Sequence, residues 1–125
     1  MKLLLDTRVL LWFMQDARAL TRDARRLIER ADELHVSSVS LWEASIKVGL
    51  GKLELDMDDL EARLNDAHVF SLPVTWEHAK QVRRLPMLHR DPFDRMLIAQ
   101  AMSEPLHLLT HNVQLRPYSD LVLLV

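Results

Sequence analysis

The chain has 125 residues, no cysteine and a formal net charge of −2 at pH 7. This length fits one domain, residues 1–125, and a hydrophobic content of 49% is enough for one sizeable core. A disulfide framework and a thiolate metal site are excluded, and no apolar run approaches the roughly 20 residues of a membrane-spanning helix. We therefore expect a cytoplasmic protein without a membrane partner. Its sixteen basic residues, mostly arginine, restrict any nucleic-acid site to a local patch.

The first thirty residues predict a buried strand and two helices. Lys2 to Leu5 is typical of a buried strand, and Val9 to Met14 is typical of a short helix that is apolar nearly all round. Asp6 and Thr7 lie between them. Thr21 is placed to cap the second helix. Its apolar residues recur at the spacing of one helical face, namely Ala24, Leu27, Ile28 and Ala31.

The middle of the chain predicts two more strands around two helices. Leu34 to Ser37 and Val69 to Leu72 are the expected strands. The first helix covers Leu41 to Val48 and is stopped by glycines at positions 49 and 51. The second covers Met57 to Ala67, with its leucines facing inward.

The last third of the chain continues this alternation. Thr75 opens a helix with Trp76, Ala79 and Val82 on one side, and the helix ends before the proline at position 86. The dipeptide Asp91-Pro92 opens a helix that runs to about residue 103. Residues 106–110 form a fourth strand and residues 121–125 a fifth. Short strands that alternate with helices predict an α/β fold with a central, mainly parallel sheet of four to five strands, covered on both faces.

Polar side chains with oxygen atoms follow these strands. Asp6 ends the first strand, and Glu43 is expected in the first turn of the helix after the second strand. Asp94 is expected in the first turn of the helix opened by Asp91, and Asn112 follows the fourth strand by two residues. Functional crevices of such sheets lie beyond the carboxyl ends of the strands. We therefore expect these side chains to meet at one edge of the sheet.

A divalent metal ion would explain this convergence. Two like unit charges about 4 Å apart repel by about 4 kcal/mol at an effective dielectric constant of 20, so clustered carboxylates need a counter-charge. Magnesium and manganese prefer oxygen ligands, which suits Asp and Glu. Local structural roles remain open. Ser40 and Glu43 match a capping box, Asp91 and Asp6 can each cap a helix, and Asp94 favours the helix dipole.

Histidine and tryptophan give weaker signals. The six histidines lack zinc-type spacing and are expected on the surface or in the core. His111 is the exception and is a candidate for a contact with the substrate, because it neighbours Asn112. Trp12, Trp42 and Trp76 lie on apolar helix faces, where core packing is expected more often than base stacking.

Four segments in order carry a resemblance to a known family. They are "LLLDT" at residues 3–7, "VSSVSLWEASIKVGLGKLEL" at residues 36–55, "LHRDPFDRMLIAQAM" at residues 88–102 and "LLTHNVQLRPY" at residues 108–118. Together they resemble the PIN-domain family, and in particular the VapC toxins of bacterial VapBC toxin–antitoxin pairs. The resemblance spans essentially the whole chain and implies a three-layer α/β/α fold.

The resemblance also implies an activity. It implies a magnesium- or manganese-dependent endoribonuclease, the toxin of a type II toxin–antitoxin pair, which cuts RNA with a metal-activated water. The implied catalytic and metal-binding residues are Asp6, Glu43 and Asp94, with Asp91 and Asn112 as additional metal ligands. It further implies a homodimer and a VapB-type antitoxin that places a basic side chain in the acidic pocket.

Two positions depart from the family's usual motifs. The chain has Asn112 where these proteins usually have an aspartate, and Arg8 where the first motif often has a histidine. An amide offers a carbonyl oxygen without full charge, so we expect a second metal ion to bind weakly or not at all.

The chain also offers candidate contacts for an RNA substrate. Four arginines flank the acidic motifs and are candidates for binding the RNA backbone, namely Arg8, Arg90, Arg95 and Arg116. Surface ion pairs are the alternative for each of them. Thr7 and Thr110 are candidates for a bond to a phosphate or a water, with local capping as the alternative.

Three other classes of protein are alternatives to a VapC-type ribonuclease. The first is a PIN-like domain that binds RNA or protein but is catalytically weak or inactive, and Asn112 is its main support. A phosphotransfer enzyme of the haloacid-dehalogenase type is disfavoured, because Arg8 stands where that class needs a second aspartate. A response-regulator receiver is disfavoured as well, because no acidic pair precedes Asp6.

Overall fold

The computed structural model describes residues 1–125 and contains one five-stranded sheet. The strand order is β3-β2-β1-β4-β5, and every neighbouring pair is parallel. The strands are β1 (Lys2–Leu5), β2 (Glu33–Ser37), β3 (Phe70–Leu72), β4 (His107–Thr110) and β5 (Val122–Leu124). The sequence prediction of a mainly parallel sheet is therefore confirmed, with all five strands present.

Six α-helices and one 3₁₀ helix connect these strands. They are α1 (Thr7–Met14), α2 (Arg22–Glu29), α3 (Ser38–Gly49), α4 (Met57–Asp66), α5 (Trp76–Arg84), α6 (Pro92–Ser103) and η1 (Val113–Tyr118). The predicted caps Thr21, Thr75 and Asp91 each accept hydrogen bonds from the first turns of their helices. None of the helices combines the length and the apolar character that crossing a bilayer requires.

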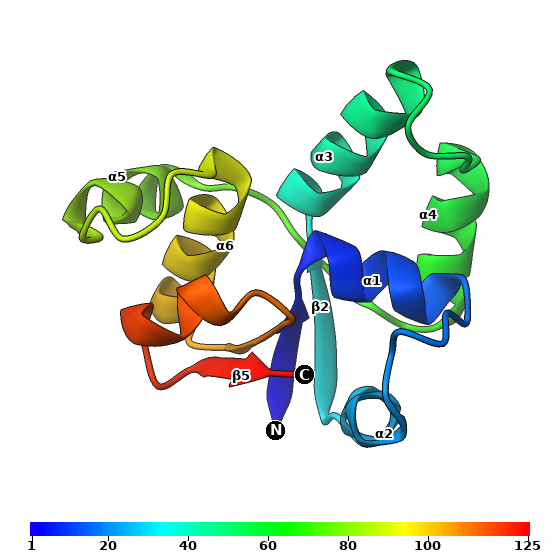
Figure 1. Ribbon diagram of the computed structural model, residues 1–125, viewed down its shortest axis with the longest axis horizontal. Helices are drawn as coiled ribbons and strands as arrows, with labels where there is room; N and C mark the ends of the chain where they lie inside the picture. The colour runs from blue at the N-terminus through cyan, green and yellow to red at the C-terminus, as the bar shows by residue number, and fades with distance from the viewer.

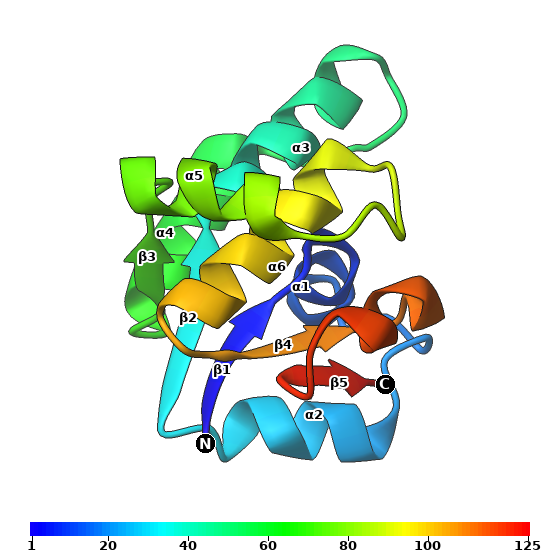
Figure 2. The same ribbon diagram turned by 90° about the vertical axis from the view of Figure 1, so that its left-hand side faces the viewer.

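The helices form a layer on each face of the sheet (Figure 1). Helices α1, α2 and α4 pack on one face, and α5, α6 and η1 pack on the other. Strand β1 lies between the two cores, because Leu4 faces one cluster while Leu3 and Leu5 face the other. The three-layer α/β/α architecture is therefore confirmed. Figure 2 shows β1, β4 and β5 lying beneath α6, with α2 on the far side.

Helix α3 begins earlier than the sequence suggests. Its N-cap is Ser37, whose Oγ accepts from the Val39 amide at 3.0 Å. Ser40 is fully buried inside the helix, where its Oγ accepts a hydrogen bond from the Thr7 hydroxyl at 3.0 Å. The predicted capping box of Ser40 and Glu43 is therefore wrong, and Glu43 lies in the second turn of α3 instead of the first.

Two of the three tryptophans are not core residues. Trp42 is 61% exposed and Trp76 is 90% exposed, so the prediction that they pack in the core is wrong. Trp12 packs against the core on the α1 side. Helical periodicity identifies a shared face, but it does not reveal whether a second layer covers that face. Trp76 begins α5 in the outer layer, and Trp42 contacts only the edge of Phe93, with ring centroids 5.0 Å apart.

Candidate active site

A cleft of about 750 Å³ lies at the carboxyl edge of the sheet, where the chain turns from β1 toward β2 on one side and β4 on the other. This is the switch point at which parallel α/β sheets commonly place ligands. The cleft is lined by Asp6, Thr7, Arg8, Glu43, Lys47, Asp91, Asp94, His111, Asn112, Val113 and Gln114. The predicted convergence is confirmed, since Asp6, Glu43, Asp94 and Asn112 all line this one cleft, together with Asp91.

Asp6 is the most buried of these acids. It is 5% exposed, and its backbone amide extends the β1–β4 pairing by donating to the Leu109 carbonyl at 3.1 Å. Its Oδ1 accepts from the Val9 amide at 2.7 Å, and its Oδ2 accepts from the Thr110 hydroxyl. Burial nevertheless raises the pKa of the Asp6 carboxyl from 3.8 to about 6. Asp6 therefore caps α1 and also presents a carboxylate that lacks a full counter-charge.

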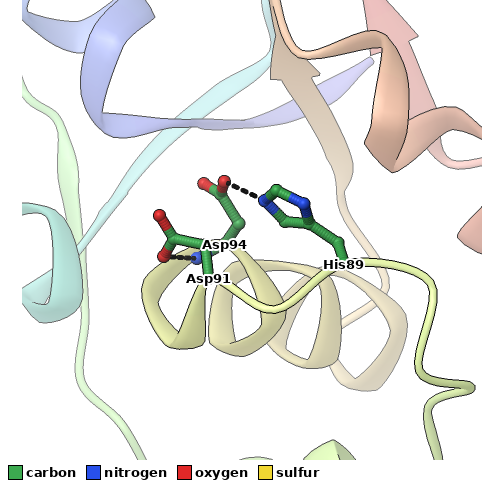
Figure 3. A group of neighbouring side chains, drawn as sticks. All are labelled: His89, Asp91 and Asp94. Carbon is green, nitrogen blue, oxygen red and sulfur yellow. Dashed lines mark hydrogen bonds and ion pairs between the residues drawn. The ribbon is translucent and has the colours of Figure 1, made fainter.

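Asp94 faces the same cleft from the first turn of α6 (Figure 3). Burial raises the pKa of its carboxyl, and the nearby charge of Asp91 raises it further. Its Oδ2 accepts a hydrogen bond from His89 Nε2 at 3.0 Å. Asp91 Oδ1 accepts from the amides of Phe93 at 2.8 Å and Asp94 at 3.2 Å. Asp91 is thus both the predicted N-cap and a member of the acidic group.

Only two basic side chains line the cleft beside the four carboxylates. Lys47 lies one helical turn beyond Glu43 on α3, and its Nζ is 3.4 Å from Glu43 Oε2. Arg8 is exposed at the start of α1 and lowers the pKa of Asp6 only slightly against the effect of burial. The cleft therefore carries an excess of negative charge, which favours a bound cation.

The donor set of this cleft suits a hard divalent cation. One ligand atom from each of His89, Asp91 and Asp94 lies within 4.8 Å of the others, and Asp6 and Glu43 line the same space. Carboxylate oxygens dominate this set, as magnesium and manganese require. Sequence reasoning missed His89 as a partner of Asp94. The sequence signal for this contact is that His89 lies two residues before Asp91. Because Asp91 is the N-cap of α6, the residues just before it lie close to the first turn of the helix.

Asn112 is in the cleft, but its amide oxygen is already engaged. Oδ1 accepts from the Gln114 amide at 3.0 Å and so caps η1, while Nδ2 donates to Asp94 Oδ2 at 3.5 Å. A donor group therefore faces the acidic residues where an aspartate would present an acceptor. In this conformation the amide oxygen is turned toward the Gln114 amide, and the role of Asn112 as a carbonyl ligand stays a prediction.

The predicted substrate contacts divide into two groups. Thr7 and Arg8 line the cleft, whereas Thr110 is fully buried and its hydroxyl is held by Asp6. Arg95 is 8% exposed and lies under the loop before α6, which differs from the expectation of an RNA contact. Neither Arg90 nor Arg116 belongs to the cleft lining, and Arg116 bonds the Ser119 carbonyl at 3.0 Å. Proximity in sequence to an acidic motif does not fix the direction of a long side chain.

His111 also lines the cleft. Its Nδ1 lies 2.6 Å from the Val125 carbonyl oxygen, which requires Nδ1 to be the donor. Its ring meets the Trp12 ring edge-on, with centroids 5.2 Å apart. The position of His111 in the cleft lining leaves a contact with substrate as a prediction.

The fold and the acidic cleft define a single class of protein. The chain belongs to the PIN-domain family, whose sequence pattern it matches over residues 3–120. Among characterised relatives, it is similar to Ribonuclease VapC22 of Mycobacterium tuberculosis (strain ATCC 25618 / H37Rv). The two are 30% identical over 117 residues, which cover 92% of this chain and 90% of the relative. The sequence-based resemblance to the PIN-domain family and its VapC members is confirmed.

Solved structures share the fold at lower sequence identity. VapBC2 from Rickettsia felis, bound to a DNA fragment from its promoter, superposes with a TM-score of 0.69 at 15% identity and covers 100% of this chain and 98% of that one. FitAcB from Neisseria gonorrhoeae gives a TM-score of 0.63 at 16% identity and covers 90% and 88%. A toxin–antitoxin complex from Klebsiella pneumoniae gives 0.59 at 18% identity and covers 87% and 85%. These likenesses establish the fold.

Proposed function

We propose that this protein is a metal-dependent endoribonuclease that hydrolyses RNA phosphodiester bonds, and that it is the toxin of a type II toxin–antitoxin pair. The observation that carries the proposal is the meeting of Asp6, Glu43 and Asp94, from three distant segments, in one cleft with few basic partners. The similarity to a VapC ribonuclease over most of both chains supports the same activity.

Asp6 and Asp94 are the proposed primary ligands of a magnesium or manganese ion, with Asp91 and Glu43 close by. The raised pKa values of Asp6 and Asp94 support this role, because buried carboxylates without a counter-charge resist ionisation. When bound, such a cation polarises a phosphoryl oxygen and lowers the pKa of water. Asn112 supplies no carboxylate, so we propose that one ion is held more tightly than any second ion.

The remaining cleft residues have roles that follow from their chemistry. Glu43 is the proposed general base, which accepts a proton from the attacking water. Lys47 Nζ lies 3.4 Å from Glu43 Oε2 and places a positive charge beside the proposed base. Arg8 is exposed at the mouth of the cleft, where its guanidinium suits a phosphate of the RNA backbone. Thr7 is buried and ties α1 to α3, so its role here is positional.

RNA cleavage tests this assignment directly. We expect cleavage that requires magnesium or manganese and stops when a chelator is added. Asp94→Asn removes one ligand charge at nearly constant size and should lower the cleavage rate at least about 100-fold, a loss of about 3 kcal/mol in transition-state stabilisation. Asp59→Asn, at an exposed position on α4, is the matched control and should cleave normally. Equal rates in Asp94→Asn and the control would refute the catalytic assignment.

A second candidate function rests on Asn112. Because its Nδ2 donates to Asp94, the cleft has one acceptor fewer than an aspartate would provide. A PIN-like domain with a weakened metal site would bind RNA or protein without cutting it. Retention of a labelled RNA in gel-shift experiments, with intact RNA recovered after incubation with manganese, would favour this function over the nuclease.

Partners follow from the toxin proposal. We propose a VapB-type antitoxin whose basic side chain enters the acidic cleft, and a homodimer of this chain in the cytoplasm. The exposed apolar side chains of Trp42 on α3 and of Leu50, the C-cap residue of α3, support a protein partner at this edge of the molecule. Light scattering tests the homodimer and should give twice the monomer mass. Co-purification with the product of a neighbouring short reading frame, together with loss of cleavage, tests the antitoxin.

A further inference from the structure

Two buried side chains hold the loop that joins α5 to α6. Tyr118, at the end of η1, and Arg95, in the second turn of α6, are 9% and 8% exposed. Neither lines the acidic cleft. Both contact the backbone of the loop that precedes Asp91, and that loop carries His89. The loop is therefore fixed from two elements that are distant from each other in sequence.

The Tyr118 hydroxyl is the common acceptor of this arrangement. Its oxygen accepts from the Leu88 amide at 3.2 Å, from the His89 amide at 2.9 Å and from Arg95 Nη1 at 3.1 Å. Backbone amides that are removed from water need such acceptors. Loss of the hydroxyl would leave the His89 amide without an acceptor and would free the backbone there, whereas the Leu88 amide would keep its bond to the Pro86 carbonyl at 3.0 Å.

The Arg95 guanidinium supplies the matching donors. Nη1 donates to the Pro86 carbonyl at 3.0 Å and lies 3.5 Å from the His89 carbonyl, while Nη2 donates to the Val82 carbonyl at 3.2 Å. Arg95 has no carboxylate partner within ion-pair distance. A buried charge that is satisfied only by neutral oxygens requires good geometry. The forked shape of the guanidinium meets that requirement and fixes both ends of the loop.

The loop in turn holds His89 next to Asp94 (Figure 3). His89 Nε2 donates to Asp94 Oδ2 at 3.0 Å, whereas Asp94 Oδ1 accepts no hydrogen bond within the protein. We propose that Tyr118 and Arg95 are positioning residues that hold His89 so that its imidazole orients the Asp94 carboxylate toward the metal. This inference rests on the proposed function, because it assigns Asp94 as a metal ligand. Partners of this kind that orient a ligand commonly alter metal affinity 10- to 100-fold.

Manganese binding without RNA tests the inference. Calorimetric titration of the full chain should give a dissociation constant about tenfold higher for Tyr118→Phe than for the wild type. His89→Leu should show a similar increase, and the double variant should be no weaker than His89→Leu alone, because Tyr118 acts through His89. Ile28→Ala, in the core on the opposite face of the sheet, is the control for stability loss and should bind manganese normally. Additive losses in the double variant would overturn the inference.

A second measurement needs no metal. In the metal-free protein, the Nε2–H proton of His89 should give a protected nuclear magnetic resonance signal that is lost in Tyr118→Phe. His78 is the internal control, because its Nε2 lies 2.6 Å from Glu104 Oε2 and its bond is remote from Tyr118. An unchanged His89 signal would overturn the inference. A wild-type protein that binds no manganese would contradict the proposed function, and the His89 signal would then decide the positioning role alone.

Discussion

Asp6 shows how one residue can serve both the fold and the site. As an N-cap it satisfies the Val9 amide, and as a buried acid it has a pKa raised to about 6. The folded protein therefore retains a proton on Asp6 between about pH 4 and pH 6, where the unfolded chain has already released it. Through this group alone, stability falls as pH rises across that window.

The first prediction follows from this linkage. The pKa of Asp6 is raised by about two units, and each unit corresponds to about 1.4 kcal/mol. Above pH 6, where Asp6 is ionised in both the folded and the unfolded state, the wild type therefore loses about 3 kcal/mol of its free energy of unfolding. Asp6→Asn retains a good capping group and cannot ionise, so its metal-free form should be more stable than the wild type above pH 6. Urea denaturation with a chelator at pH 4 and pH 8 measures this difference. A wild type and a variant with the same pH dependence would contradict it.

A substitution at position 112 can add a carboxylate to the cleft instead of removing one. Asn112→Asp adds a carboxylate beside Asp94, so the metal-free protein should become less stable through repulsion, while manganese should bind about tenfold more tightly. Aspartate can also cap η1, which keeps the local structure. Calorimetry gives the affinity and urea denaturation gives the stability. No gain in affinity, with the new carboxylate seen in the cleft, would show that position 112 is not a ligand.

At the scale of elements, the contact between α1 and α3 sets the distance between two acids. Thr7 follows Asp6, and its hydroxyl donates to Ser40, which lies one turn before Glu43 on α3. Ser40→Ala removes the acceptor and leaves the buried Thr7 hydroxyl without a partner. The free energy of unfolding should fall by about 1–3 kcal/mol. Ser38→Ala, exposed on the same helix, should be nearly neutral, and equal effects of the two changes would exclude this role for the contact.

The sequence allowed most elements to be predicted because their signals are local. Thr21, Thr75 and Asp91 are capping residues placed directly before periodic apolar positions, and all three cap helices. The start of α3 was missed because Ser37, Ser38 and Ser40 are all plausible caps. Only the buried contact between Ser40 and Thr7 distinguishes them, and that contact joins residues 33 positions apart.

At the scale of the whole molecule, the order of the parallel strands determines which distant residues lie close together. Because β1 lies between β2 and β4, Asp6 and Asn112, which follow β1 and β4, meet at one edge, and the first turn of α6 brings Asp94 to the same cleft. The sequence could not show where long side chains point. Arg95 was expected at the substrate and lies under a loop, and His89 was not expected to contact Asp94. Both outcomes depend on the path of residues 85–91.

The most direct test of the account is the binding of manganese to the metal-free protein, measured by calorimetry at neutral pH. Acidic residues from different segments should bind the same ion, so the wild type should bind one manganese ion tightly. Asp6→Asn and Asp94→Asn should each weaken that binding strongly, while Asp59→Asn should leave it unchanged. Absence of binding to the wild type, or the same affinity in all four proteins, would contradict the account.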